Sequence, residues 1–386
     1  MQSAGQAWLV LELTNSPFKL GVISALQFAP ILFFSFVAGA IADRVPKRRL
    51  IVGTQTALLA QAFGLSALIW SGHVQYWHVA TLAALYGLAN AVDMPARQSF
   101  VGEMVESDDL ANAIALNSAA FSGARIVGPA AAGLLVAHYG VGLAFFLNGV
   151  SFLAVILALL AIRTEGFPRP RKGTTVLQEI AEGVGYAVRT PRVSLVLSLL
   201  LTVSVFVINY NILVPLFARD VLHQGAHGFG FLMAALGAGA LAGALVLTLL
   251  RGGQPPLVLV VAPAAGVCAA ILSLAPTRQF WLASGLLFVA GFSQILFTAS
   301  SNTTLQVTAP NELRGRMMSL YALVFAGVTP IGSLLIGLIA EALGVSAACA
   351  VGGGLGLVCV LALSARWKRR GAAWSVEKFR LPPRYC

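Results

Sequence analysis

Charged residues are scarce in this chain of 386 residues: Asp, Glu, Lys and Arg together make up 10%, against about a quarter in soluble domains. Hydrophobic residues make up 58% and the mean hydropathy is +0.85, which excludes a water-soluble fold. The ten-residue alternation of a membrane barrel is also missing. Apolar runs of about 20 residues recur instead, and each can cross the ~30 Å hydrocarbon layer as a helix. The sequence therefore predicts an all-α membrane protein.

The residue patterns of an enzyme are missing as well. The four cysteines lack CxxC spacing, and three of them sit in apolar runs, which is typical of packing residues: Cys268, Cys349, Cys359 and Cys386. No Ser/His/Asp, metal-ligand or phosphate-loop pattern supports a membrane-embedded enzyme acting on lipid head groups. No soluble output domain supports a sensor or scaffold, and no basic segment of a cleavable signal peptide opens the chain. We therefore expect no enzymatic activity and no cofactor.

The apolar runs predict eleven membrane spans, and the segment Ala7–Leu13 adds about half of another. The spans are expected at Leu20–Ala42, Leu50–Trp70, Trp77–Arg97, Leu110–Ala137, Leu143–Ile162, Val193–Phe217, Gly228–Leu250, Leu257–Ala275, Phe280–Val307, Met317–Ala340 and Val345–Ala365.

The positive charges predict the orientation of these spans. Of the 25 Lys and Arg residues, 21 fall in loops on one side, 3 fall on the other, and Arg125 is left inside a span. The positive-inside rule then makes the Pro46–Arg49 loop and the C-terminal tail cytoplasmic, in an inner (cytoplasmic) membrane. This also accounts for the net charge of +11 without a nucleic-acid partner. The same parity requires Ala7–Leu13 to be the outer end of a first helix, giving twelve helices with the first one incomplete in this chain.

The longest cytoplasmic connection divides the predicted spans into six and six. We expect an N-terminal bundle (1–162), a linker (163–192), a C-terminal bundle (193–365) and a basic cytoplasmic tail (366–386). Within the linker, Leu177, Ile180, Val184 and Val188 recur at helical spacing, which predicts an amphipathic helix at the inner headgroup layer.

The two bundles also repeat one another weakly. Residues 110–141 align with 313–345, and the alignment pairs three glycines with three others: Gly128 with Gly332, Gly133 with Gly337, and Gly140 with Gly344. Duplicated six-helix halves are typical of transporters, in which a substrate site between the halves opens to either side. Chance similarity between glycine-rich helices is the alternative.

One loop concentrates charge between two apolar runs: "GAIADRVPKRR", residues 39–49. It resembles the signature of the major facilitator superfamily between the second and third helices, Gly-x-Leu-Ala-Asp-Arg-x-Gly-Arg-Lys. Its key positions are matched by Gly39, Asp43, Arg44, Lys47 and Arg48. The resemblance implies a fold of twelve transmembrane helices in two bundles. It also implies a cytoplasmic latch, in which Asp43 meets Lys47 or Arg48 and the N-terminal end of the helix beginning near Met317.

Further segments resemble the exporter branch that includes siderophore and drug efflux proteins: "WLVLELTNSP", "DMPARQSF", "LVPLFARDVL" and "PNELRGRMMSLY". The predicted fifth helix carries Gly123, Gly128, Pro129 and Gly133, which resemble the Gly-Pro motif of antiporters in part. Small residues there permit close helix packing, for which Gly239 and Gly243 at GxxxG spacing are the expected partners. Generic membrane packing explains these glycines equally well.

Arg125 and Asp93 are the sharpest candidates for a substrate and proton pathway. Arg125 lies about fifteen residues, ~22 Å, into its helix, where a lone charge is costly and must face a cavity or a partner. The two residues form either a buried structural pair or a site that binds a polar substrate and couples to a proton. Arg97, four residues after Asp93 on one helix face, is the rival partner.

The remaining polar candidates are weaker. Glu12 is a second possible proton carrier, although an interfacial position is the commoner explanation. Cavity-lining roles or helix–helix hydrogen bonds are open for Asn117, Asn209, Gln294 and Asn302. The five histidines all fall on the outer side. Of these, His73/His78 and His223/His227 have metal-compatible spacing, but no acid or cysteine cluster supports a metal site.

Together, these features and the resemblance predict a monomeric carrier that exports a small organic molecule, drug-like or siderophore-like, across the lipid bilayer in exchange for protons. Proton-coupled uptake is the alternative.

Overall fold

The structure is a computed structural model that describes residues 2–42, 45–101, 103–104, 109–162, 164, 176–249 and 255–377. Within these ranges the chain is helical and contains no β-strand, as predicted. A first unit comprises α1 (Gln2–Thr14), α2 (Pro17–Ala42), α3 (Lys47–Trp70), α4 (Tyr76–Val101) and α5 (Leu110–Ala161). After the linker helix α6 (Val176–Arg189), a second unit comprises α7 (Pro191–Phe206), α8 (Tyr210–Leu216), α9 (Ala226–Leu249), α10 (Val258–Leu274), α11 (Phe280–Thr308), α12 (Asn311–Ala322), α13 (Thr329–Leu343) and α14 (Val345–Glu377).

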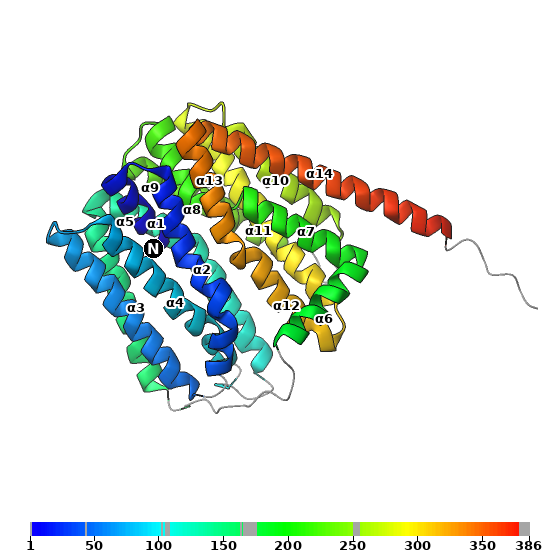
Figure 1. Ribbon diagram of the computed structural model, residues 1–386, viewed down its shortest axis with the longest axis horizontal. Coiled ribbons are helices and arrows are strands. Elements are labelled where there is room, and N and C mark those ends of the chain that lie inside the picture. The colour runs from blue at the N-terminus through cyan, green and yellow to red at the C-terminus, as the bar shows by residue number, and fades with distance from the viewer. Residues whose placement is uncertain are drawn as a thin grey trace, which may run out of the picture.

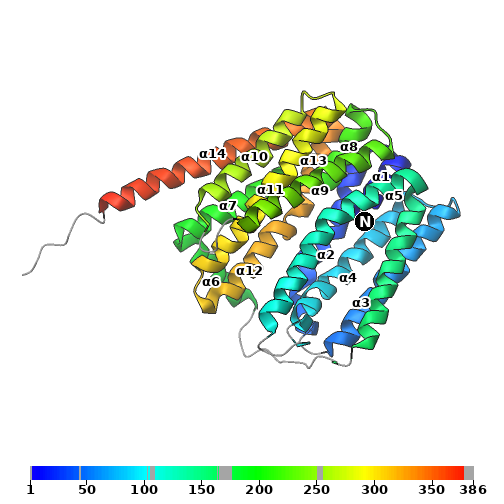
Figure 2. The same ribbon diagram turned by 180° about the vertical axis from the view of Figure 1, so that it is seen from behind.

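Successive helices alternate in direction, so the bundle has two ends. The basic end carries Pro46–Arg49 and α6, and the distal end carries the α1–α2 and α3–α4 turns. Figures 1 and 2 show the first unit, blue to cyan, beside the second unit, green to red, with α2 next to α13 and α5 next to α9. These two pairs, the α2–α13 seam and the α5–α9 seam, join the units.

Two glycines turn the chain at the distal end. Gly140 has φ 79° and ψ 169°, and it interrupts α5 so that the helix runs out to the distal end and back. Gly344 has nearly the same conformation, φ 87° and ψ 161°, between α13 and α14. Residues with a side chain rarely adopt positive φ, whereas glycine does so readily. The two glycines that the sequence alignment pairs therefore form equivalent turns between helices in the two units.

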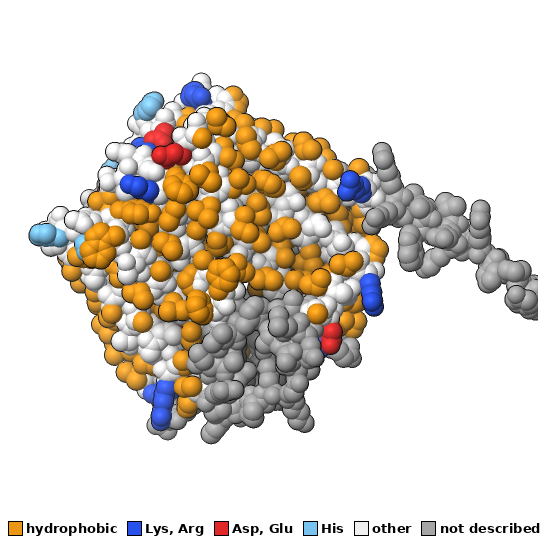
Figure 3. All heavy atoms as spheres, in the orientation of Figure 1, with side chains coloured by type: hydrophobic (Ala, Val, Ile, Leu, Met, Phe, Trp, Pro, Cys, Tyr) orange, Lys and Arg blue, Asp and Glu red, His pale blue; other side chains and the backbone are white. Residues whose placement is uncertain are grey.

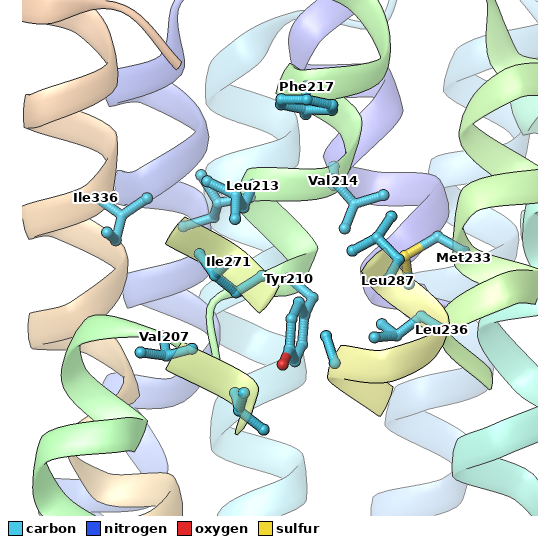
Figure 4. Close-up of a cluster of buried hydrophobic side chains, with 14 of the residues drawn as sticks. Val207, Tyr210, Leu213, Val214, Phe217, Met233, Leu236, Ile271, Leu287 and Ile336 are labelled. Carbon is cyan, nitrogen blue, oxygen red and sulfur yellow. The ribbon is translucent and has the colours of Figure 1, made fainter. Parts of the chain in front are cut away.

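Two predicted spans depart from a regular α-helix: one is interrupted, and both contain a π-helical turn. The predicted helix Val193–Phe217 is interrupted after Phe206, resumes at Tyr210, and ends in a π-helical turn, Phe217–Val221. The predicted helix Met317–Ala340 contains a second π-helical turn, Leu323–Gly327, between α12 and α13. Such turns are frequent at functional sites because they widen a helix locally. Figure 4 shows Val207, Tyr210 and Leu213 of the first break packed among Ile271 and Leu287.

The surface suits a lipid environment. Eight helical stretches of the described chain are long and apolar enough to cross a membrane, and the apolar helix Val258–Leu274 is somewhat shorter. In Figure 3, apolar side chains cover the middle of the face, and charged side chains lie near its margins. Helices α1 and α4 and the first part of α5 fall outside this set.

The linker and tail are both helical near the second unit. Helix α6 lies within the predicted linker and packs against α12, with a Glu182–Arg316 ion pair and a 3.0 Å hydrogen bond from Tyr186 Oη to Thr308 O. Val184 and Val188 of its predicted apolar stripe are exposed, Val188 to 72%. Helix α14 continues to Glu377, twelve residues beyond the predicted end of its span at Ala365, so the first part of the expected tail extends that helix.

Candidate functional site

The bases of the predicted latch bind within the first unit. Lys47, at the start of α3, is 3% exposed and forms an ion pair with Glu103, just after α4. Arg48 donates from Nε to Leu159 O at 2.8 Å and from Nη2 to Leu160 O at 2.7 Å, at the C-terminal end of α5. A cation is favourable at such an end because of the helix dipole and the unsatisfied carbonyls. The two bases thus tie the basic ends of α3, α4 and α5 together.

Other members of the latch are less fully described. Asp43 and Arg44 lie outside the described residues, as does the environment of Gly39 within α2. Glu103, the partner of Lys47, was not singled out from the sequence. The sequence feature that could have identified it is its position two residues after the end of α4, at the basic end of the bundle.

Asp93 is buried and extensively hydrogen-bonded in the first unit. It is 5% exposed, and its Oδ1 accepts hydrogen bonds from Thr54 Oγ1 at 2.7 Å and Gln55 Nε2 at 2.9 Å. Its Oδ2 accepts from Arg97 Nε at 3.2 Å, and Arg97 Nη2 lies 3.1 Å away. Four donors from α3 and α4 therefore satisfy the carboxylate, as a buried charge requires.

Among the described side chains, Arg97 is thus the cationic partner of Asp93. The side chain of Arg125 lies outside the described residues. Helix bounds separate the two candidates in depth: Asp93 lies eight residues, ~12 Å, from the basic end of α4, and Arg125 lies fifteen residues, ~22 Å, from the basic start of α5.

A cluster of amides occupies the interior of the first unit. Gln2 Nε2 donates to Gln61 Oε1 at 3.1 Å, and Asn148 Nδ2 donates to Gln2 Oε1 at 2.9 Å, which links α1, α3 and α5. Gln6 Nε2 donates to Val79 O at 3.4 Å, and its Oε1 has no hydrogen-bond partner among the described residues. The sequence signal was weak: Gln61 and Asn148 are isolated amides in apolar runs, and the other two amides lie among small and polar residues, so this cluster was missed.

The break between α7 and α8 places polar groups inside the second unit. Asn209 is 5% exposed and donates from Nδ2 to Val205 O at 2.9 Å, while its Oδ1 has no partner among the described residues. The buried Tyr210 hydroxyl and Ser204 Oγ are also unsatisfied there. Gly332 of α13 makes room, since a Cβ at that position would lie 2.5 Å from Val205 O and 2.9 Å from Asn209 Nδ2.

Helix α11 adds a polar stretch toward the basic end. Ser300, Ser301 and Thr304 are buried, and none of their hydroxyls has a partner among the described residues. Asn302 donates to Met318 Sδ at 3.8 Å and accepts from Gln306 Nε2 at 2.6 Å. In a bilayer, unpaired polar groups are costly unless water or a ligand reaches them. The second unit therefore offers more unsatisfied groups to a ligand than Asp93 does.

Three of the predicted pathway residues make few or no hydrogen bonds to other helices among the described residues. Gln294 of α11 is half-buried, and Asn117 of α5 is exposed. Glu12 is exposed near the distal end of α1 and accepts a hydrogen bond from Trp8 Nε1 at 2.6 Å within its own helix. This geometry fits the interfacial interpretation of Glu12.

The α2–α13 seam is built on one face of α13. A Cβ on Gly21 would lie 2.8 Å from Ser333 O, and one on Gly337 would lie 3.2 Å from the Cα of Gly21. Ser24 and Ser333 share a 2.9 Å hydrogen bond beside these glycines. The backbones thus approach as closely as small residues allow, as in other membrane helix pairs.

At the distal end of this seam, Glu341 caps α2. Its Oε2 accepts from Ser16 Oγ at 2.9 Å and from the Phe18 backbone N–H at 3.1 Å. A carboxylate is favourable there because the helix N-terminus is positive. Nearby, Arg219 donates from Nη1 to Leu11 O and Asn15 Oδ1, both at 3.1 Å, at the C-terminal end of α1. Opposite charges of the second unit therefore bind the two helix ends that flank the α1–α2 turn.

The α5–α9 seam uses Gly133 of the predicted Gly-Pro motif. A Cβ on Gly133 would lie 2.2 Å from the Cα of Gly230, whereas one on Gly123 would meet nothing within 4 Å. Gly128 is half-buried in α5, and the Pro129 side chain lies outside the described residues. The predicted partner helix is α9, as expected, but the contact is made by Gly230 rather than by the predicted glycines. A Cβ on Gly239 or Gly243 would meet the backbone of Phe288 or the side chain of Ile295, both in α11. GxxxG spacing identifies a close-packing face but not the helix it meets.

The sequence of this chain is similar to those of known proteins. A family model described as "Transmembrane secretion effector" matches residues 1–379. The multidrug efflux pump Tap of Mycolicibacterium fortuitum is 28% identical over 353 residues, covering 88% of this chain and 85% of that protein. Macrolide efflux protein A of Streptococcus pyogenes is 25% identical, covering 87% and 84%. The staphyloferrin A transporter of Staphylococcus aureus is also 25% identical, covering 88% and 85%.

Solved structures share the fold. A crystal structure of the nucleoside transporter NupG superposes with a TM-score of 0.69 at 11% identity, covering 95% of this chain and 94% of that one. A POT family transporter gives a TM-score of 0.70 at 12% identity, covering 94% and 92%. These likenesses confirm the fold class predicted from the sequence. The relatives are transporters and not enzymes, as predicted.

Proposed function

This chain belongs to the transmembrane secretion effector family of the major facilitator superfamily, and we propose that it exports amphipathic organic molecules from the cytoplasm in exchange for protons. Its relatives include pumps named for multidrug and macrolide efflux and a transporter named for a siderophore, which supports a drug-like or siderophore-like substrate. The basic end then faces the cytoplasm, in keeping with the 21 bases on that side.

The observation that carries the mechanism is the matched pair of seams. Gly133 on α5 and Gly337 on α13, which the internal repeat aligns, each pack against the opposite unit, on Gly230 and Gly21. A pseudo-symmetric pair of close contacts suits two bundles (1–162 and 193–365) that rock as a monomer about a shared axis. Together with the Glu341 and Arg219 contacts at the α1–α2 turn, the seams correspond to a state closed at the distal end.

Substrate is expected to reach the unsatisfied polar groups of the second unit from the basic end. Asn209 Oδ1, the Tyr210 hydroxyl and the α11 hydroxyls offer hydrogen bonds inside an apolar surround, which suits a mostly apolar ligand with a few polar atoms. We assign Asp43 to a latch that closes the basic end in the alternate state, as the loop signature implies. Arg125 is the cationic candidate for the same pathway.

Dissipating the proton gradient should stop export. The measurement is the accumulation of a labelled macrolide in cells that express the chain, before and after a protonophore. Accumulation should rise to the level of cells without the chain, because an antiporter cannot move substrate uphill without its ion. Efflux that continues unchanged would reject proton antiport. A gradient-dependent increase in labelled drug caused by the chain would instead indicate uptake.

Neutralising Glu341 should loosen the distal end. In Glu341→Gln the carboxylate cap on α2 loses its charge, worth about 0.3–1 kcal/mol at an exposed helix end, or about a two- to fivefold change in population. A cysteine introduced at Ser24, buried in the seam, should then react about two- to fivefold faster with an impermeant maleimide. Glu12→Gln is the matched control, because Glu12 is an exposed distal acid bonded within its own helix. Equal labelling in both variants would contradict the role of Glu341.

A further inference from the structure

Two histidines meet across the α5–α9 seam at the distal end. His138 on α5 and His227 on α9 are both exposed, and their ring centroids lie 4.7 Å apart with the planes at 75°. They lie five and three residues from Gly133 and Gly230, so the close glycine contact fixes the spacing of the two helices beneath them. Neither residue belongs to the polar pathway assigned above.

The ring spacing fits a shared metal ion. Zinc binds an imidazole nitrogen at about 2.0–2.1 Å, and two such rings at a near-tetrahedral angle have centres about 5 Å apart. The observed 4.7 Å between the ring centroids is close to that separation.

The tautomer of His138 also suits a ligand. His138 Nδ1 lies 3.0 Å from Leu134 O, and because a carbonyl only accepts, Nδ1 carries the hydrogen. The lone pair is then on Nε2. Metal-binding histidines usually donate their other ring nitrogen to a carboxylate or a backbone carbonyl in this way, which fixes the ring and raises its basicity.

We propose that His138 and His227 form a two-histidine site for a divalent transition metal, with zinc and nickel as the best-suited ions, and that a bound ion staples the α5–α9 seam shut. Imidazole ligands favour these metals over magnesium or calcium, which prefer oxygen. No group of three or more His, Cys, Asp or Glu side chains gathers in the described part of the chain, so water completes the coordination. Spacing along the sequence had instead suggested the pairs His223/His227 and His73/His78 as metal-compatible.

Stapling follows from the position of the site. Its two ligands belong to different units, and opening the distal end requires α5 and α9 to separate there. Both rings can hold one ion only when the distal end is closed. The ion therefore binds this state more tightly and shifts the population toward it. The chemistry predicts a reversible inhibitor site for zinc rather than a transport site.

The test is zinc binding by the purified full chain in detergent. Zn²⁺ at about 100 times its dissociation constant should raise the apparent unfolding temperature by about 3 °C, and Mg²⁺ at the same concentration should not. His138→Ala and His227→Ala should each abolish the shift. The matched controls His223→Ala and His78→Ala remove exposed or half-buried histidines at the same end and should retain it. A zinc shift that is absent from the wild type, or that survives in both seam variants, would overturn the site.

A second measurement tests the staple. Zinc added at the distal face should slow efflux by about tenfold in the wild type, and both seam variants should be resistant. Binding without inhibition would overturn the staple while leaving the metal site in place. Because the thermal measurement needs no transport, its outcome is independent of whether the chain exports drugs.

Discussion

Replacing Gly133 with alanine should reduce efflux by at least about tenfold, a shift of about 1.4 kcal/mol in the balance of states. The new Cβ would lie 2.2 Å from the Cα of Gly230 and 3.2 Å from its carbonyl carbon, and no flexible side chain is present to move aside. Helices α5 and α9 must then shift apart at this contact. The distal end loses one of its two seams, and the carrier spends less time in the state that accepts substrate from the basic end.

The matched control is Gly123→Ala on the same helix. A Cβ there meets nothing within 4 Å, and an alanine in a helix interior is favoured over glycine by about 0.5–1 kcal/mol. The Gly123→Ala variant should therefore export substrate as well as the wild type does. Its unfolding temperature should be equal to that of the wild type or slightly higher. Measuring efflux and the unfolding temperature of both variants separates a seam effect from a general effect of losing glycine. Equal efflux in Gly133→Ala and Gly123→Ala would contradict the role of the α5–α9 seam.

Local features of the fold were largely predictable from the sequence. Apolar runs of membrane length located the spans, and helical spacing located α6, because both signals depend only on neighbouring residues. The paired positions of Gly140 and Gly344 in the repeat marked two equivalent distal turns. The resemblance of residues 39–49 to a superfamily signature added the fold, which the structural comparisons confirm.

The break in the predicted helix Val193–Phe217 was not predictable by the same means. Val193–Phe217 is apolar throughout apart from a few small polar residues, and its only strong helix breaker, Pro215, lies inside α8 rather than at the break. The interruption occurs at Val207–Asn209, where Asn209 bonds back to Val205 O and the core closes over Tyr210. Tertiary packing decided the local geometry, so no window of sequence contains the signal.

Hydrogen bonds between residues far apart in the sequence account for the other differences between the predictions and the structure. Glu341 caps a helix more than 300 residues earlier in the chain, and Gln2, Gln61 and Asn148 come from three helices. Glu341, Gln61 and Asn148 are isolated polar positions in apolar runs, whereas Gln2 lies in a segment of small and polar residues. The sequence indicates that such a residue needs a partner, because unpaired polar groups are costly in a membrane. Only the packing of the helices selects which partner it has.

Removing the Asp93 carboxylate should produce the second large effect. In Asp93→Ala, the donors Thr54 Oγ1 and Gln55 Nε2 and the Arg97 guanidinium lose their common acceptor. Leaving the buried Gln55 amide unsatisfied costs about 1–3 kcal/mol. The other two donors are less affected, because Thr54 Oγ1 keeps Ile51 O as an acceptor at 2.9 Å and the Arg97 side chain is 41% exposed. We expect a clear fall in the unfolding temperature and loss of most efflux. Asp109→Ala, which removes an exposed acid without a side-chain cap bond, is the control and should change neither.

A paired substitution decides between the structural and the transport role of Asp93. Its two oxygens already accept from four donor groups, which leaves little capacity for a substrate or an exchanging proton, so we assign it a positioning role through α3–α4 packing. Neutralising both partners in Asp93→Asn with Arg97→Gln removes the uncompensated charge that either single change leaves behind. Stability and efflux should therefore both recover toward the wild type in the double variant. Recovered stability with efflux still absent would instead place Asp93 on the substrate or proton pathway, because only a group that binds or transfers would be missed after the packing is restored.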